Sequence, residues 1–178
     1  MSPRRSHPWL TVTVAVILVL LFVVNLAVIY AFSAESGEES GSRSAGITAT
    51  VVRVLYPNFD EFEEEEAQRV LTSTHHFVRK AAHFSEFALL GVLSAAILLF
   101  LSACVPPLKI KIWMTLLFPP LFCLLYAVSD EVHQIFSGRG PRVTDVLIDF
   151  GGAVTGVFFA HVIAFVIRTL HRRRKEKP

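Results

Sequence analysis

The sequence predicts an all-α integral membrane protein with four transmembrane helices and both chain ends in the cytoplasm (N-in/C-in). Hydrophobic residues make up 53% of the 178 residues and charged residues only 18%. A soluble domain of this size cannot bury that much apolar surface. Four apolar runs are each long enough to cross a hydrocarbon core of about 30 Å. The lysines and arginines are also distributed unevenly between the segments that join these runs.

The first apolar run predicts an N-terminal transmembrane anchor over residues 1–32. A cleavable signal peptide is the alternative, but its apolar region is normally only about 7–15 residues long. Residues 33–78 are then an extracytoplasmic loop of about 45 residues. Within it, the small and polar stretch 33–46 predicts a flexible linker. The β-branched stretch 47–56 predicts a short strand or an extended segment.

An acidic run that begins at Asp60 predicts a helix, because Asn58 or Asp60 can cap it and its glutamates lie at the positive helix end. Three further apolar spans follow, near residues 81–105, 112–132 and 143–167. They predict a three-helix membrane core over residues 79–167. Residues 168–178 are a basic cytoplasmic tail.

The positions of lysine and arginine orient these spans. The N-terminus carries two of them, the turn 106–111 two and the tail six, so ten of the 17 lie on one side. Cytoplasmic segments carry the excess of lysine and arginine, so we expect that side to be cytoplasmic. The basic tail then needs no nucleic-acid partner, because retention in the cytoplasm and contact with anionic membrane lipids explain it.

Ionisable and polar residues gather at the predicted outer ends of the last three spans. Such groups at membrane depth are costly and mark a functional site by default. Asp130 and Glu131 also end a helix, where the dipole disfavours anions, so they need partners. We expect Asp130, Glu131, Arg139 and Asp145 to form one network.

The residue types in this group suggest roles. Histidines and carboxyl groups transfer protons, whereas guanidinium groups bind phosphate or carboxylate. The candidate catalytic residues are His83, Glu86, Asp130, Glu131, His133 and Asp145. The candidate ligand-binding residues are Arg79, Lys80, Gln134, Arg139, Arg142 and Asp149.

A metal ion is chemically compatible with this group, since carboxylates and a histidine are suitable ligands. No compact ligand motif such as HExxH occurs, so the sequence assigns no metal residues and leaves the cofactor open. It gives no support for a serine or cysteine nucleophile.

Three classes of function therefore stay open. One is an enzyme at the outer leaflet, the second a non-catalytic protein that binds a lipid or a drug, and the third a small transporter. The charges gather at one membrane face, which disfavours a transport pathway. A network of salt bridges that only locks helix ends together is the structural alternative.

Two glycines four residues apart, Gly152 and Gly156, predict close packing of the last span on another helix. This packing would turn Asp145 and Asp149 toward the other helices. On the opposite face, His161 is expected to make a hydrogen bond between helices.

Four motifs, taken in chain order, resemble the signature of the VanZ-like family over roughly residues 56–165. They are His83-x-x-Glu86, Asp130-Glu131-x-x-Gln134, Arg139 and Asp145-x-x-x-Asp149-x-x-Gly152. The resemblance implies a small multi-span protein of the bacterial cytoplasmic membrane. The family's namesake is associated with low-level resistance to the glycopeptide teicoplanin. We therefore expect a polar pocket at the outer face that binds or processes a cell-envelope molecule. Membrane lipids, a lipid-linked cell-wall precursor and a glycopeptide are the implied partners.

Overall fold

The computed structural model describes residues 8–104, 110–136, 138 and 140–176. Within these residues the chain is all-α, and four of its helices are long and apolar enough to cross a membrane, as the sequence predicted. The elements are α1 (Pro8–Ser33), α2 (Gly37–Leu55), the short 3-10 helix η1 (Phe59–Glu61), α3 (Glu64–Cys104), α4 (Ile112–Phe136) and α5 (Val143–Glu176).

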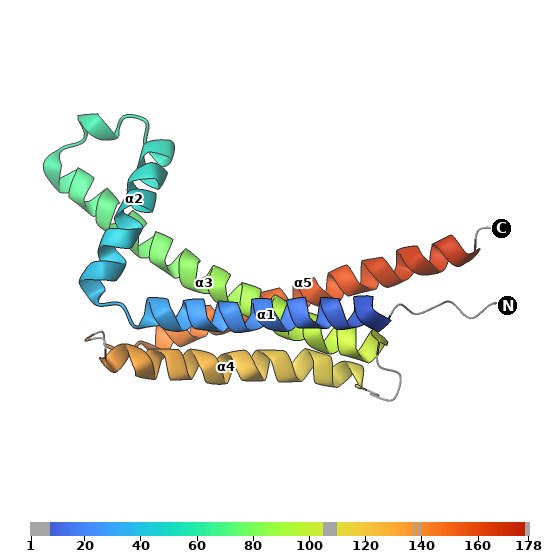
Figure 1. The fold of residues 1–178 in the computed structure, drawn as a ribbon. Helices are drawn as coiled ribbons and strands as arrows, with labels where there is room; N and C mark the ends of the chain where they lie inside the picture. The colour runs from blue at the N-terminus through green and yellow to red at the C-terminus, as the bar shows by residue number, and fades with distance from the viewer. Residues whose placement is uncertain (1–7, 105–109, 137, 139, 177–178) are drawn as a thin grey trace.

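Helices α1, α3, α4 and α5 form an elongated bundle (Figure 1). The start of α1 and the end of α5 lie at one end of it, while α2 and the start of α3 project from the other. The 41 residues of α3 span about 62 Å, so this helix is about twice as long as a hydrocarbon core is thick. We call the end from which α2 projects the α2 end; it corresponds to the predicted outer face.

The core of the bundle contains side chains from all four long helices. Ile29 of α1 packs into it, and the hydroxyl of Tyr126 on α4 donates a hydrogen bond to the Leu26 carbonyl at 2.9 Å. The first helix is therefore an integral part of the bundle as well as an apolar span. The remaining buried residues of this core are Phe87, Leu90, Cys123, Ala127 and Ala153.

Helices α3 and α5 touch at backbone distance, and glycine makes this possible. A Cβ added at Gly152 would overlap the Phe84 carbonyl, and one at Gly156 would overlap the Ala88 carbonyl. The predicted close packing of these two glycines is confirmed. His161 on α5 also makes the expected bond between helices, since its Nε2 lies 2.9 Å from the Thr115 hydroxyl of α4.

The predictions of a flexible linker over 33–46 and of a strand or extended segment over 47–56 were wrong, because both stretches belong mostly to α2. Ser36 and Glu39 cap this helix reciprocally, with the Ser36 side chain accepting from the Glu39 amide at 3.2 Å. The backbone and hydroxyl of Ser36 donate to the Glu39 carboxylate, which lowers the pKa of Glu39. Val52 of α2 is buried. The cap and this buried face explain why a segment that begins with small and polar residues is helical.

The acidic run is helical, as predicted, but it starts later. Asn58 precedes only the short η1, and the continuous helix α3 begins at Glu64. Between them, the Phe62 ring lies 5.6 Å from Phe59 and 5.9 Å from Tyr56, measured between ring centroids. This aromatic cluster fills the corner where the chain turns from α2 into α3. From there α3 runs into the predicted second span without a break.

Candidate functional site

Three potential ligand residues from three helices meet at the α2 end of the bundle. His83 comes from α3, Asp130 from α4 and Asp149 from α5, and one ligand atom of each lies within 4.8 Å of the others. We call these three residues the triad. Asp149 is fully buried and Asp130 is 5% exposed, whereas His83 is partly exposed. The close packing of α3 on α5 brings His83 and Asp149 together.

Asp149 is the least compensated member of the triad. Its Oδ1 lies 3.7 Å from the His83 Nδ1, which is too long for a hydrogen bond. Within the described part of the chain, neither carboxylate oxygen of Asp149 has a hydrogen-bond partner. An unpaired buried carboxylate is strongly unfavourable, so this position needs an explanation beyond stability.

The two acids near the end of α4 are held by short bonds. The Gln134 side chain donates to the Asp130 Oδ2 at 2.9 Å, and the Arg142 backbone amide donates to the Glu131 Oε2 at 2.7 Å. The other carboxylate oxygen of Glu131 is buried and has no partner among the described residues. Ser33 at the end of α1 also donates to the Asp130 carbonyl at 3.3 Å.

Lys80 on α3 forms an ion pair with Asp145 on α5. Their side chains are only 18% and 13% exposed, so the pair is largely shielded from water. It joins the same two helices as the glycine contact, which makes it a structural link beside the triad.

The network predicted for Asp130, Glu131, Arg139 and Asp145 stays a prediction, and the described residues show three contacts of its members. Asp130 bonds to Gln134, Glu131 bonds to the Arg142 backbone, and Asp145 pairs with Lys80. Arg139 lies outside the described residues.

Two predicted site residues contribute differently from the rest. The His133 ring stacks on Tyr30 of α1, with centroids 4.5 Å apart. Arg142 is exposed and contributes its backbone amide to Glu131. From the sequence we expected His133 and Arg142 to act beside the acids of α4. In the structure, helix packing gives the His133 ring a partner on α1.

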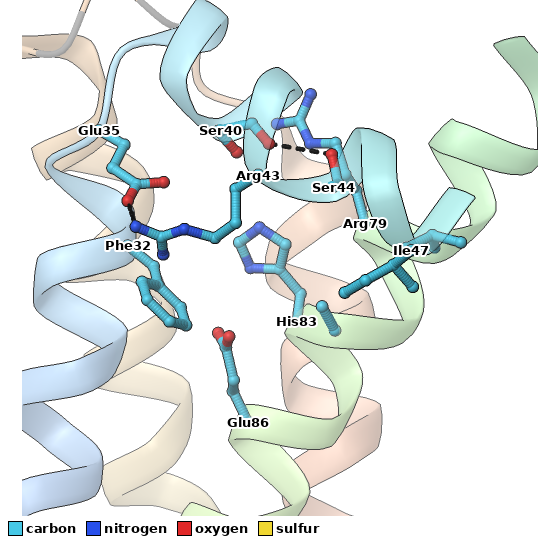
Figure 2. A pocket seen from close by; sticks show the side chains of 11 residues that line it. Phe32, Glu35, Ser40, Arg43, Ser44, Ile47, Arg79, His83 and Glu86 are labelled. Carbon is cyan, nitrogen blue, oxygen red and sulfur yellow. Dashed lines mark hydrogen bonds and ion pairs between the residues drawn. The ribbon is translucent and has the colours of Figure 1, made fainter. Parts of the chain in front are cut away.

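Arg79, His83 and Glu86 line one side of a cavity of about 250 Å³ (Figure 2). Arg79 is partly buried and makes no ion pair with the described residues. Three of the predicted site residues of α3 thus face an accessible space, whereas the fourth, Lys80, pairs with Asp145. The other lining residues are Phe32, Glu35, Ser40, Arg43, Ser44, Ile47, Val78 and Ala82.

The opposite side of this cavity was not predicted. It is formed by the end of α1 and by α2, where Arg43 pairs with Glu35 and its guanidinium lies 4.2 Å from the centroid of the Phe32 ring. Ser44 lies 2.6 Å from the His75 Nε2 and fixes α2 to α3. The one sequence signal for this wall is the Ser36-x-x-Glu39 capping box, which marks the start of α2.

An apolar groove of about 400 Å³ continues from the cavity along the surfaces of α1 and α3. Phe32 and Glu86 line both hollows. The groove is otherwise lined by Leu21, Val24, Asn25, Val28, Ser85, Leu89 and Leu93.

Comparison with known proteins agrees with the motifs at the α2 end. Neither the curated proteins nor the solved structures compared with the chain match it. The family model described as VanZ/LLP1 matches residues 14–165, which include most of α1 and every described residue of the triad and the cavity. The chain belongs to the VanZ/LLP1 family.

Proposed function

We propose that the α2 end binds the anionic head group of a cell-envelope lipid, with the lipid's hydrocarbon chain in the groove between α1 and α3. The observation that carries this proposal is the continuity of the two hollows, which share Phe32 and Glu86. One hollow carries several charged side chains, whereas the other is lined mainly by apolar residues, with Glu86 where the two meet. A membrane lipid has the same order, with a polar head at the interface and an apolar chain below it.

The cavity is lined by two arginines and two glutamates, and Arg79 is the group that can hold an anion. Arg43 is already paired with Glu35, whereas Arg79 has no ion pair within the described residues. A guanidinium group binds a phosphate or a carboxylate through two parallel hydrogen bonds. Arg79 is therefore the residue that we expect to hold the phosphate of the head group.

Processing of the bound head group is the further possibility that the geometry favours. His83 lines the cavity, and its Nδ1 faces the buried Asp149 at 3.7 Å. A histidine placed between a ligand and a carboxylate is suited to general acid–base catalysis, and Glu86 in the same cavity is a second proton carrier. The ion pair of Lys80 with Asp145 is sufficient to hold α3 and α5 together. A network with only this structural role would need neither Arg79 nor Asp149.

The family resemblance extends the proposal to teicoplanin. A protein that sequesters or alters an envelope lipid or a lipid-linked precursor would change how much glycopeptide reaches its target. We therefore expect expression of the chain to lower teicoplanin susceptibility only if the cavity is intact.

Replacing Arg79 with glutamine tests the head-group proposal. We expect the affinity of the purified full chain for fluorescent phosphatidic acid in detergent micelles to fall at least about tenfold, because a charge-assisted hydrogen bond contributes roughly 1.5–3 kcal/mol. Arg69→Gln is the matched control, since Arg69 lies on the same helix with its side chain 72% exposed. Inorganic phosphate should compete only weakly if the lipid chain also contributes. Equal affinities of both variants and the wild type would contradict the proposal.

A further inference from the structure

We propose that the triad of His83, Asp130 and Asp149 binds a divalent first-row transition-metal ion such as Zn²⁺ or Mn²⁺. Its ligand atoms lie within 4.8 Å of one another. Ligand atoms about 2.0–2.2 Å from one tetrahedral zinc ion lie roughly 3.3–3.6 Å from one another. Side-chain movements of about an ångström would therefore bring all three onto one ion.

Asp149 gives independent support for a cation. It is fully buried, and neither of its carboxylate oxygens has a hydrogen-bond partner in the described part of the chain. Its contact with the His83 Nδ1, at 3.7 Å, is too long to satisfy it. A metal ion would give this buried carboxylate the partner that it lacks among the described residues.

The surroundings of the triad also favour positive charge. One carboxylate oxygen of Glu131 is buried without a partner among the described residues, and Lys80 is already paired with Asp145. Asp130 and Glu131 lie in the last two turns of α4, where the helix dipole is negative. A cation here would therefore be stabilised by the dipole as well as by the carboxylates.

The donor set indicates which ion fits. One imidazole and two carboxylates suit zinc, manganese or ferrous iron, whereas calcium and magnesium prefer oxygen ligands alone. Three protein ligands leave a coordination position for water or for an oxygen of a bound molecule. Because His83 also lines the cavity, that position would lie beside the proposed head-group site. His83 would then act as a metal ligand, which leaves Glu86 as the proton carrier.

Metal binding can be measured without any lipid, so its failure and the failure of the lipid proposal are distinguishable. Tag-free full-length protein in detergent would be stripped with a chelator and titrated with Mn²⁺, followed by electron paramagnetic resonance. Zn²⁺ content after dialysis would be measured by elemental mass spectrometry. We expect about one ion per wild-type chain, together with a rise in the thermal midpoint when the metal is added.

Asp149→Asn should lose at least tenfold in metal affinity and show no metal-dependent rise in thermal midpoint. It removes only the charge of a buried side chain, so its metal-free melting should be at least as high as that of the metal-free wild type. His83→Gln provides a second variant on another helix. His76→Gln and His171→Gln are the controls: His76 is exposed on α3, and His171 lies near the other end of α5. Both should keep one ion.

Two results would overturn the proposal. One is a wild-type protein that binds no stoichiometric ion and melts identically with and without metal. The other is Asp149→Asn and His83→Gln proteins that bind as much metal as the wild type, which would mean that the ion binds elsewhere.

Discussion

Replacing Gly156 with alanine is expected to lower the free energy of unfolding by about 3 kcal/mol. The added Cβ would overlap the Ala88 carbonyl of α3, and a backbone atom cannot move aside as the end of a side chain can. The two helices would have to separate, which would also displace Asp149 from His83. Unfolding in mixed detergent micelles with increasing dodecyl sulfate, followed by circular dichroism, measures the change.

Gly151 supplies the matched control on the same helix. A Cβ there would meet only the Phe84 side chain at 3.9 Å, which is an ordinary van der Waals distance. Gly151→Ala should therefore be neutral or stabilising by up to about 1 kcal/mol, because alanine is the better helix former. Equal stability of the Gly151→Ala and Gly156→Ala proteins would show that the helices have room at their contact.

Replacing Lys80 with methionine is expected to destabilise the protein by about 3 kcal/mol, because Asp145 would stay charged and shielded from water. The double variant Lys80→Met/Asp145→Leu should recover most of the loss, since it removes both charges. The same micelle unfolding experiment on the wild type, Lys80→Met, Asp145→Leu and the double variant gives four free energies of unfolding, from which the coupling between the two residues follows.

The ion pair of Arg69 with Glu65 provides the comparison. It also lies on α3, but its N···O distance is 3.8 Å and its side chains are 72% and 85% exposed. Arg69→Met should change stability by less than about 1 kcal/mol. If Lys80→Met is as mild as Arg69→Met, Asp145 is hydrated and the pair does not hold α3 to α5.

The four spans could be predicted, and the three residues of the triad could be named among the site candidates, because these signals are local in the sequence. An apolar run long enough for the bilayer is visible without any tertiary contact. His83, Asp130 and Asp149 were visible because charged groups are rare at membrane depth. The pair Gly152 and Gly156 gave the helix contact that turns Asp149 inward, and its small-xxx-small spacing is a packing signal in itself.

The cavity wall and the individual partners could not be predicted in the same way. Arg43 lies in a stretch whose small and polar composition is typical of a linker, and only the cap at Ser36 points to a helix. His133 lies three residues from Asp130, but its partner Tyr30 is on α1, about 100 residues away in sequence. Packing between helices decides which face of α4 contacts α1, and the composition of the sequence does not indicate it.

The lipids bound to the extracted protein show directly whether the cavity and the groove hold an anionic envelope lipid. The wild-type chain would be purified in mild detergent, and its bound lipids compared by mass spectrometry with those of the membrane it came from. We predict strong enrichment of phosphate-bearing anionic lipids or lipid-linked precursors, with the enrichment lost in Arg79→Gln and kept in Arg69→Gln. Bound lipids that match the membrane composition in all three proteins would contradict the account.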